Sequence, residues 1–441
     1  MQEKPILEKA ERIRDVIRYI KRFKNAAVVI HIDDDIIDSP LFVSHIRDIA
    51  LIHQAGLRVI IVPGARKKID EVLSQNGISW TFEHGCRITP NEAIPLIRNA
   101  AFDAANVVMT SLAGENLTAV IGNWVRARGK GVLSGVDFGT AGEIDKLDDS
   151  TIQTVLDNGF IPIFPCIGWS LAGKPYNISS IQLASQIAIH LQADKLFFLL
   201  PNAELSENYF TIPSDIGLSP EGCIPAMNLE ELDEFLKANK KKNEKILPLL
   251  HLAKKAVTSG VTRVHILNGS IEGTLPCEIF SDLGSGTMIY KSNYGKFRAM
   301  RREDISAVLS LIRPFVRKGI LLPRTEKQME AEYNDFIVYE LDGAIRACAA
   351  LHMYDRTQAE IAAVAVDENC SHIGVGPKMI EYLIEKAKTI SIESVFILTT
   401  RTADWFEKQG FVPDEINTLP QKRLEKWTPE RGSKLFRLQL R

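Results

Sequence analysis

The chain has 441 residues, well beyond the roughly 250–300 residues at which a single hydrophobic core stops growing, so we expect two or three domains. Its 45% hydrophobic and 24% charged residues are those of a soluble globular protein, and its formal net charge is only −2. This charge argues against a nucleic-acid-binding protein and against a protein that binds an anionic membrane.

The N-terminus and the cysteines indicate where the protein works. No apolar run approaches the roughly 20 residues that span a bilayer, and the charged start, MQEKPILEKAERIRDVIRYIKRF, lacks the apolar core of a secretory signal. The six cysteines lie far apart and do not cluster with histidines, a pattern that favours neither a disulfide framework nor a zinc site. We therefore expect a cytoplasmic protein without a bound metal.

The first half of the chain alternates β-branched runs with amphipathic helical patterns, which predicts an α/β sheet with crossover helices. Five runs are predicted as buried strands: residues 26–32, 57–64, 160–168, 195–200 and 262–269.

A polar stretch containing Gly295 interrupts this pattern, and we interpret residues 291–296 as a linker between a domain at 1–290 and a domain at 297–441. The second domain begins with a predicted helix over 304–316. Two strands follow, with Asp342-Gly343 as the turn between them, because an Asp-Gly pair between apolar runs favours a hairpin. An α+β fold is expected here.

A glycine turn in the second domain indicates an anion site. The strand 360–366 runs into a loop with Gly374 and Gly376, and Pro377 then opens an amphipathic helix. Glycines let backbone N–H groups converge, and a helix N-terminus carries roughly half a positive charge. Strand, turn and helix together predict a cradle for a pyrophosphate.

This segment, followed by LTTRTADWFEKQGF (398–411), resembles the core of the GNAT acetyltransferases, which bind the pyrophosphate of acetyl-CoA on such a loop. The resemblance assigns acetyl-CoA contacts to the strand and to the loop. These contacts are Ala363, Val364, Ala365, Val366, Ser371, Gly374, Val375 and Gly376. Ser371 stands where the family has Gln or Arg, which removes one contact but leaves the backbone amides.

Acyl transfer to an amine requires a base, because an alkylammonium has no lone pair. Glu360 is the candidate, since the following IAAVAV run offers apolar neighbours that can raise a carboxyl pKa. The alternative is an edge-strand glutamate in water. Thr399 is the candidate hydrogen-bond donor to the leaving thiolate, although threonine also occurs in strands for its β-propensity.

A substrate with carboxylates favours arginine partners, whose planar guanidinium matches a carboxylate with two hydrogen bonds. Arg324 in GILLPRT and Arg431 in PERGSK are the candidates, with Ser433 as a polar helper. Each arginine is also compatible with an ordinary surface position.

The whole chain resembles the bacterial N-acetylglutamate synthases, in which an amino-acid kinase-like α/β sandwich precedes a GNAT domain. VIIVPGARKKID (59–70), EIFSDLGSGTMI (278–289), KGILLPRT (318–325) and ERGSK (430–434) carry the resemblance. It implies that Glu360 is the base, Thr399 the hydroxyl near sulfur, and Arg324, Arg431 and Ser433 the L-glutamate contacts. It also implies acetyl-CoA as co-substrate, no metal, and the first step toward arginine.

The same resemblance implies that the first domain is a degenerate kinase that binds L-arginine as a feedback inhibitor, through the segment of Glu278 and Gly284, and builds a homo-oligomer, commonly a hexamer. Active kinases carry a lysine and a Gly-Gly pair after the first strand. Here Asp33, Asp34 and Asp35 stand there instead, and three carboxylates repel a triphosphate. A strand-end loop is the favoured interpretation of these aspartates, and a cation site is the alternative.

Two other functions remain open at this point. One is a GNAT enzyme that acetylates another amino acid, and the other is a non-catalytic arginine sensor. The sign of any arginine effect, the number of subunits and a direct or water-mediated action of Glu360 are also left open by the sequence.

Overall fold

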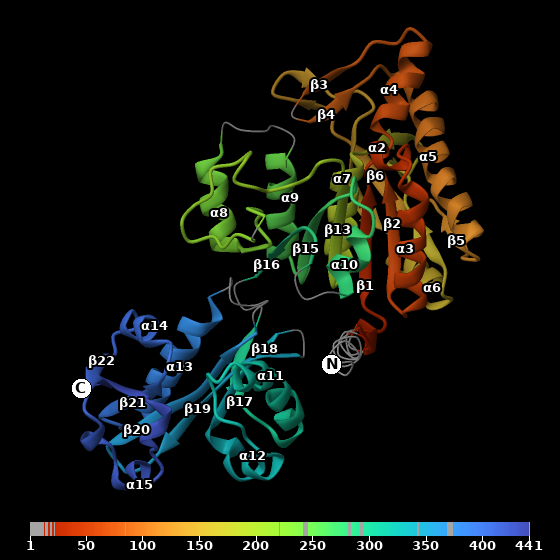
Figure 1. Ribbon diagram of the computed structural model, residues 1–441. Coiled ribbons are helices and arrows are strands. Elements are labelled where there is room, and N and C mark those ends of the chain that lie inside the picture. Colours follow the sequence, from red (N-terminus) through yellow and green to blue (C-terminus); the bar gives the residue numbers. More distant parts are fainter. Residues whose placement is uncertain are drawn as a thin grey trace. The chain divides into compact units, whose positions relative to one another are not determined.

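The computed structural model describes residues 13–440 apart from 14–15, 18–19, 22, 84, 220, 241–245, 281–283, 292–294, 342–343 and 368–373. The chain forms two compact units, Met1–Ser292 and Asn293–Arg441 (Figure 1). Half of the predicted linker, 292–294, lies outside the described residues. Among the helices that are described, none combines the length and the apolar character needed to cross a membrane.

The centre of the first unit is an eight-stranded sheet with the order β14-β16-β15-β13-β1-β2-β10-β5. Its strands are β1 (Ala27–Ile32), β2 (Arg58–Pro63), β5 (Ala119–Ile121), β10 (Ile161–Ile163), β13 (Lys195–Leu200), β14 (Ala226–Asn228), β15 (Arg263–Asn268) and β16 (Thr287–Tyr290). All neighbours are parallel except β15 and β16. Both faces of the central strands are covered, which explains their continuous apolar runs.

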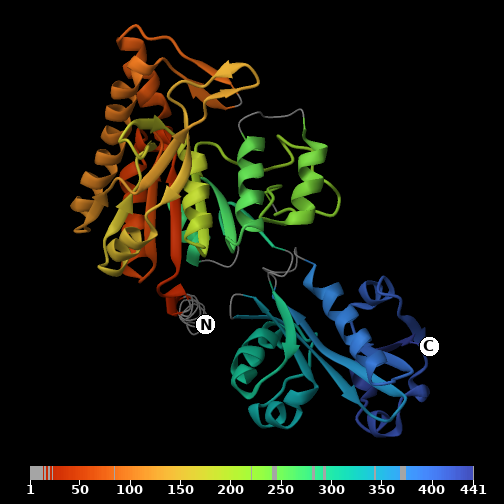
Figure 2. The same ribbon diagram turned by 180° about the vertical axis from the view of Figure 1, so that it is seen from behind.

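Helices cover both faces of this sheet (Figure 2). They are α2 (Asp34–Ile37), α3 (Phe42–Gln54), α4 (Arg66–Gln75), η1 (Asn91–Ala93), α5 (Ile94–Gly114), α6 (Asp149–Asp157), α7 (Ser180–His190), α8 (Leu229–Ala238), α9 (Ile246–Thr258) and α10 (Thr274–Phe280). Successive strand residues point to opposite faces. Val29 therefore packs into the core with α7 and α9, while Val28 packs into the core with α3 and α5. The predicted α/β sandwich is confirmed.

One predicted strand is wrong in its extent. Residues 160–168 form two strands, β10 in the large sheet and β11 (Ile167–Trp169) in a four-stranded sheet with the order β12-β11-β6-β9. Pro165, which has no N–H for a sheet ladder, lies at the break. The other strands outside the large sheet are β3 (Thr81–Glu83), β4 (Cys86–Ile88), β6 (Val125–Gly129), β7 (Val132–Leu133), β8 (Val136–Asp137), β9 (Gly142–Leu147) and β12 (Pro175–Asn177).

The second unit is built on a seven-stranded sheet with the order β17-β18-β19-β20-β21-β23-β22. Its strands are β17 (Lys296–Ala299), β18 (Phe336–Leu341), β19 (Ala344–Met353), β20 (Gln358–Val366), β21 (Ser394–Thr399), β22 (Val412–Asp414) and β23 (Lys434–Gln439). The predicted hairpin is confirmed by the antiparallel pairing of β18 and β19, and its turn at Asp342-Gly343 lies outside the described residues.

Helices also lie on both faces of the second sheet. They are η2 (Arg302–Asp304), α11 (Ile305–Arg317), α12 (Glu326–Glu332), η3 (Tyr333–Asp335), α13 (Val375–Thr389), α14 (Ala403–Glu407), η5 (Ile416–Thr418), α15 (Gln421–Leu424) and η6 (Pro429–Arg431). Met379 and Leu383 of α13 pack against one face, and Val308 and Ile312 of α11 pack against the other. The helix predicted to open at Pro377 begins two residues earlier, at Val375.

Two neighbouring strands of this sheet separate partway along their length. β20 and β21 run parallel, and their pairing ends at Glu360 and Phe396, although β20 continues to Val366 and β21 to Thr399. The β19–β20 register shifts opposite Cys348 and Ala350, and Ala363 has a φ of +52°. A bulge of this kind bends its strand, so β20 is free to diverge from β21 beyond Glu360.

Two buried histidines lie in the core strands of the first unit. His31 of β1 places Nε2 3.0 Å from Ser180 Oγ, and burial lowers its pKa to about 3. His265 of β15 has Nδ1 2.6 Å from Glu278 Oε1, and burial lowers its pKa to about 4 in spite of that carboxylate. Both imidazoles are therefore neutral in the folded protein near pH 7.

These depressed pKa values predict a loss of stability in mild acid. A histidine whose pKa falls on folding contributes stability above its unfolded pKa, about 6.5, and that contribution is lost as the pH decreases. Between pH 7 and pH 5 we expect each histidine to remove about 2 kcal/mol from the free energy of unfolding. Urea unfolding of wild type and His31→Gln at both pH values measures this, and an equal acid loss in both proteins would contradict it.

Candidate active site

Glu360, the predicted base, lies in a buried ion pair. Its side chain is 5% exposed. Arg423 of α15 donates from Nε to Oε2 at 2.7 Å and from Nη2 to Oε1 at 3.1 Å, and the Tyr354 hydroxyl donates to Oε2 at 3.0 Å. The sequence suggested apolar neighbours instead. Because side chains alternate along a strand, Ile361 points to the opposite face, and the Glu360 carboxylate meets polar groups.

The pKa shifts around Glu360 agree with this pairing. Burial and the Glu360 carboxylate raise the pKa of the Tyr354 phenol, so Tyr354 remains a protonated donor. Burial lowers the pKa of the Arg423 guanidinium, but the ion pair with Glu360 raises it by more. The carboxylate is thus held in one orientation by two donors that keep their protons.

Arg324 belongs to a second polar network beside the first. The guanidinium donates from Nη1 to Glu332 at the end of α12, and its Nη2 lies 3.4 Å from His352 Nε2. His352 Nδ1 in turn lies 2.8 Å from Asp335 Oδ2. The Arg324 Cζ also lies 5.2 Å from the centre of the Phe336 ring. Arg324 is therefore held by α12, by β19 and by an aromatic face.

Arg431 has a different environment. It lies in η6, and its Nη2 donates to the carbonyl oxygen of Ile320 at 3.0 Å. Burial and the neighbouring charge of Arg423 lower the pKa of the Arg431 guanidinium. In the described part of the chain it has no carboxylate partner. Its positive charge is therefore available to an anion.

These groups form one cluster. His352 lies directly opposite Glu360 in the β19–β20 ladder. Glu332, the partner of Arg324, contributes to the raised pKa of Tyr354, whose hydroxyl binds Glu360. The charge of Arg423, the partner of Glu360, reaches Arg431. The β19–β20 pairing therefore brings Arg324, through His352, beside Glu360, and Arg431 is close enough to the Arg423–Glu360 pair to feel the charge of Arg423.

Thr399 and Ser433 lie at the far side of the separation between the two strands. Thr399 ends β21 and pairs with Lys434, the residue after Ser433. The Thr399 Oγ1 is 2.7 Å from Thr402 Oγ1 and accepts from Thr402 N at 3.1 Å. In this structure the hydroxyl thus fixes the loop before α14.

The predicted cofactor residues of β20 follow Glu360 along the divergent part of the strand. Ala363 has the positive φ of the bulge, and Ala362 is the last residue before it that pairs with β19. A non-glycine residue in this region is uncommon and often marks a functional site. The bulge and the separation from β21 leave backbone groups of Ala363, Val364, Ala365 and Val366 without the regular ladder on the β21 side.

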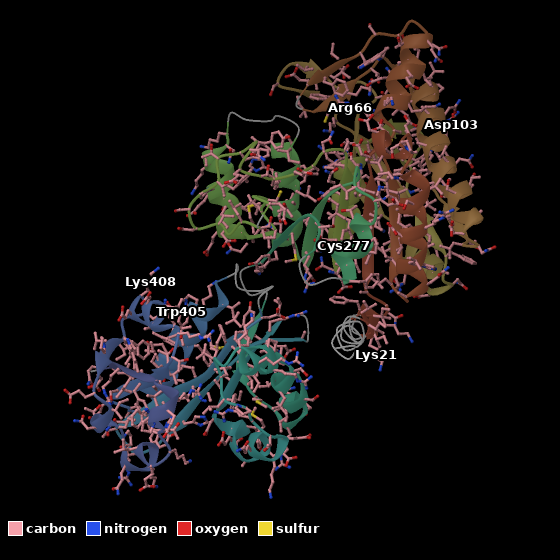
Figure 3. All side chains as sticks on the ribbon, in the orientation of Figure 1. Lys21, Arg66, Asp103, Cys277, Trp405 and Lys408 are labelled. Atoms are coloured by element: carbon pink, nitrogen blue, oxygen red, sulfur yellow. The ribbon has the colours of Figure 1, made fainter. Side chains whose placement is uncertain are left out.

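The predicted loop residues surround the start of α13. Gly374 is the N-cap, with a φ of +66°, and Val375 is the first helical residue. A Cβ on Gly376 would lie 3.2 Å from the Trp405 ring, which Figure 3 labels, so glycine lets the helix approach α14. A Cβ on Gly376 would also lie 3.8 Å from Val366, so the first turn of this 15-residue helix, whose N–H groups have no partner within the helix, begins beside the end of β20. Ser371 lies outside the described residues.

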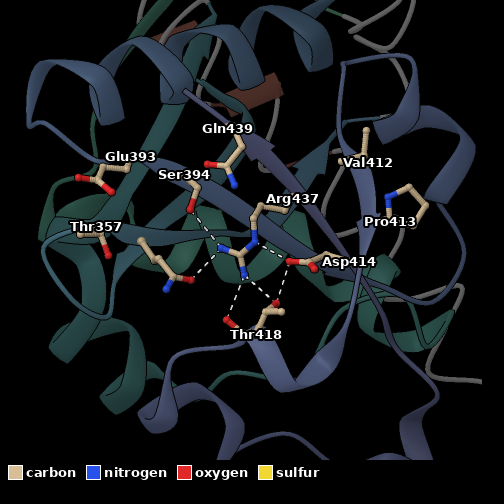
Figure 4. A pocket seen from close by; sticks show the side chains of 10 residues that line it. Thr357, Glu393, Ser394, Val412, Pro413, Asp414, Thr418, Arg437 and Gln439 are labelled. Atoms are coloured by element: carbon tan, nitrogen blue, oxygen red, sulfur yellow. Dashed lines mark hydrogen bonds and ion pairs between the residues drawn. The ribbon is translucent and has the colours of Figure 1, made fainter. Parts of the chain in front are cut away.

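A pocket of about 500 Å³ lies at the other end of these strands, beside Gln358 and Ser394 (Figure 4). Arg437 forms its floor with hydrogen bonds to Asp414, Gln358, Ser394 and Thr418. Those bonds use all five N–H groups of the guanidinium, so Arg437 joins the strands and has no donor left for a ligand. We therefore do not assign the active site to this pocket, in spite of its volume.

In the first unit, Glu278 binds its own loop. Its Oε2 accepts from Ser285 N at 2.6 Å and Gly286 N at 3.0 Å, and its Oε1 faces His265. Burial raises the pKa of this carboxyl, but those hydrogen bonds lower it by more, leaving a carboxylate. Gly284 has a φ of +66°, and a Cβ there would lie 2.6 Å from Glu278 Oε2.

The three aspartates after β1 have structural partners. Asp33 caps α2 by accepting from Asp35 N at 3.1 Å, and burial raises its pKa to about 6. Asp34 accepts from the backbone N–H of Lys67, whose ammonium lies 3.1 Å from Asp38. Across the residues that the structure covers, no group of three His, Cys, Asp or Glu side chains is arranged to hold a metal ion.

Comparison with known proteins agrees with both units. The model of the amino acid kinase family matches residues 26–268, and the model of the acetyltransferase (GNAT) family matches residues 305–411. The amino-acid acetyltransferase of Pasteurella multocida is 34% identical over 95% of this chain and 94% of its own length. That of Pseudomonas syringae is 31% identical over 96% and 98%.

Solved structures give the same result. N-acetylglutamate synthase from Neisseria gonorrhoeae, complexed with coenzyme A and L-arginine, is 28% identical over 98% of this chain and 99% of its own, with a TM-score of 0.80. A second structure of that enzyme is complexed with coenzyme A and N-acetyl-glutamate, with 29% identity, the same coverage and a TM-score of 0.60.

The two units and these matches define an acyltransferase in which an amino-acid kinase-like unit precedes a GNAT unit. The chain belongs to the amino-acid acetyltransferase family, the family of the N-acetylglutamate synthases. The resemblance and the fold class predicted from the sequence are confirmed.

Sequence reasoning missed four residues of the cluster: Tyr354, Arg423, Glu332 and His352. Arg423 lies in QKRLEK, which looks like any exposed helical turn, and it reaches Glu360 from 63 residues away. His352 could have been found from the sequence, because residues two apart in a strand share a face and His352 therefore lies on the same face of β19 as Ala350. No local pattern indicated Arg423.

The buried ion pair predicts a large effect of Arg423 on stability. Arg423→Met leaves the Glu360 carboxylate buried with only Tyr354, and breaking a buried pair costs about 3–5 kcal/mol. The double variant Arg423→Met, Glu360→Gln should recover part of this loss because no charge stays unpaired. Urea unfolding measures both, with exposed Arg401→Met as the control, and equal stability of the single and double variants would refute the pairing.

Proposed function

We propose that this protein transfers the acetyl group of acetyl-CoA to the α-amine of L-glutamate, producing N-acetyl-L-glutamate and CoA as the first step of arginine biosynthesis in the cytoplasm. The observation that carries the proposal is the cluster of a buried carboxylate among arginines where β20 leaves β21. The complexes of the gonococcal relative with coenzyme A and N-acetyl-glutamate support it.

In the proposed complex, two arginines bind the two carboxylates of L-glutamate. Arg431 offers a charge that no described carboxylate neutralises, and Arg324 lies beside His352, which is opposite Glu360 in the ladder. A guanidinium binds a carboxylate through two parallel hydrogen bonds, so a pair of them fixes both position and orientation. Ser433 precedes Lys434, which pairs with Thr399, and it adds a hydroxyl donor for the substrate.

Glu360 then receives the proton of the substrate ammonium, directly or through a water, which frees the amine to attack the thioester. Arg423 and Tyr354 keep the carboxylate in one orientation while this occurs. Backbone N–H groups of Ala363, Val364, Ala365 and Val366 polarise the thioester carbonyl and hold the pantetheine. Donors preorganised where negative charge develops are effective in catalysis. No metal is needed for this reaction.

The leaving thiolate and the pyrophosphate have their own partners in the proposal. Thr399 donates its hydroxyl hydrogen to the sulfur of CoA, in place of its contact with Thr402. The first N–H groups of α13, at Val375 and Gly376, bind the pyrophosphate with the loop of Ser371 and Gly374. Gly374 has the backbone conformation that starts such a helix directly after a turn.

This proposal predicts the following substrate profile. Thiol release from acetyl-CoA should be fast with L-glutamate and slow with D-glutamate, aspartate, glutamine and lysine. Glu360→Gln should lower kcat by about 10²–10⁴-fold, the usual contribution of a positioned base, and should still bind acetyl-CoA. The matched control is Glu381→Gln, an exposed residue of α13. Preference for another amine would identify a different acetyltransferase, and no turnover with any amine would favour an arginine sensor.

The kinase-like unit has a regulatory role in the proposal. It binds L-arginine near the loop that Glu278 organises. It also brings subunits together in a homo-oligomer, which the family resemblance implies is a hexamer. The relative complexed with L-arginine supports the ligand. The three aspartates, which cap α2 and hold α4, are not suited to a nucleotide triphosphate, since like charges repel.

Arginine should therefore inhibit acetyl transfer at millimolar concentration. Glu278→Gln should raise the arginine concentration for half-inhibition by about tenfold, because hydrogen bonds to a charged group are worth roughly 1.5–3 kcal/mol. Initial rates against arginine measure this, with exposed Glu221→Gln as the control. A rate that does not respond to arginine in wild type would remove the regulatory role and leave the acetyltransferase proposal intact.

A further inference from the structure

The two candidate substrate arginines differ in how their charges are balanced. Arg431 has a carbonyl partner, Ile320, and a like charge nearby, Arg423. Arg324 has a carboxylate partner, Glu332, in an ion pair through Nη1. A ligand carboxylate can bind Arg431 without displacing another carboxylate. At Arg324 the ligand carboxylate meets a guanidinium that is already paired with Glu332.

Glu332 is suited to be a removable partner. Its side chain is 40% exposed, whereas that of Arg324 is 18% exposed. It is the last residue of α12, a helix of seven residues whose buried residue is Met329. The Glu332 carboxylate can therefore turn into water without disturbing the packing of the helix. An ion pair with this much exposure is also weak, because water screens it.

Arg324, in contrast, is held in place independently of Glu332. Its Nη2 faces His352 Nε2, and Asp335 binds the other ring nitrogen of His352, which orients that imidazole. Its Cζ lies over the Phe336 ring, and Phe336 is fully buried in β18. Removal of Glu332 therefore leaves the guanidinium in position, with its Nη1 donors free.

We propose that Glu332 occupies Arg324 in the empty site as an internal substitute for a substrate carboxylate, and that a dicarboxylate amino acid displaces it on binding. The inference rests on the proposed function and deepens it, because it makes Glu332 a determinant of substrate affinity. Each binding event then exchanges one ion pair for another at Arg324, and the exchange reduces the net gain in free energy. His352, which faces Arg324, lies directly opposite Glu360 in the β19–β20 ladder, so the exchange occurs beside the reacting groups.

The test is a comparison of Glu332→Gln with wild type in initial-rate assays. The variant removes the competing charge and keeps the shape, so the KM for L-glutamate should fall about threefold, the value of a partly exposed ion pair. The kcat should change by less than twofold, and the KM for acetyl-CoA should stay the same. Glu330→Gln, on the exposed face of the same helix, is the matched control and should resemble wild type.

A second pair of variants separates competition at Arg324 from a general effect of charge. In an Arg324→Gln background, Glu332→Gln should no longer improve kcat/KM for L-glutamate, because its partner is missing. An improvement of the same size in both backgrounds would overturn the exchange. So would an unchanged or raised KM in the single variant, which would show that Glu332 positions Arg324 instead.

Binding of N-acetyl-L-glutamate, measured by calorimetry, distinguishes a failure of the exchange at Arg324 from a failure of the proposed function. If wild type does not acetylate L-glutamate but Glu332→Gln binds the dicarboxylate about threefold more tightly, the proposed function fails and the exchange holds. If wild type acetylates L-glutamate and the variant binds no more tightly, the exchange fails alone. If none of these proteins acetylates L-glutamate or binds the dicarboxylate, both are refuted.

Discussion

The pairing between β20 and β21 ends at Glu360 and Phe396, and this interruption organises the second unit. A parallel sheet that continued to Val366 would bury the backbone N–H groups of β20 in a regular ladder. The positive φ of Ala363 and the register shift against β19 turn that part of the strand away. The sheet thereby loses its regular ladder between β20 and β21 next to the start of α13.

The charges of the candidate site depend on the same interruption. Glu360 is the last residue of β20 that pairs with β21, so its side chain lies where these two strands separate, and Arg423 and Tyr354 reach it there. A buried carboxylate needs such partners because desolvation of an isolated charge is expensive. The cluster has more arginines than carboxylates near Arg431, and this excess attracts an anion. Affinity for a dicarboxylate would therefore follow from the charge balance around Glu360.

The first unit shows polar residues in structural use at places where an enzyme of the kinase fold needs catalytic groups. Asp33 caps α2, Asp34 binds the first turn of α4, and His31 is neutral in the core. The Glu278 carboxylate forms hydrogen bonds with His265 and with the backbone of its own glycine-containing loop. The ligand site that we propose near Glu278 needs only the backbone of this loop, which these hydrogen bonds hold in place.

The sequence by itself determined the fold class and the family, and it supplied the candidate site residues, because these depend on local patterns. Alternation and periodicity located the core strands, and the glycines at 374 and 376 located the start of α13. Only the tertiary structure decided what surrounds each site residue. Arg423 meets Glu360 across 63 residues, and Glu332 rather than solvent faces Arg324. No local pattern encodes the first contact, because it depends on how α15 packs against the sheet, and the second depends on how α12 folds back beside Arg324.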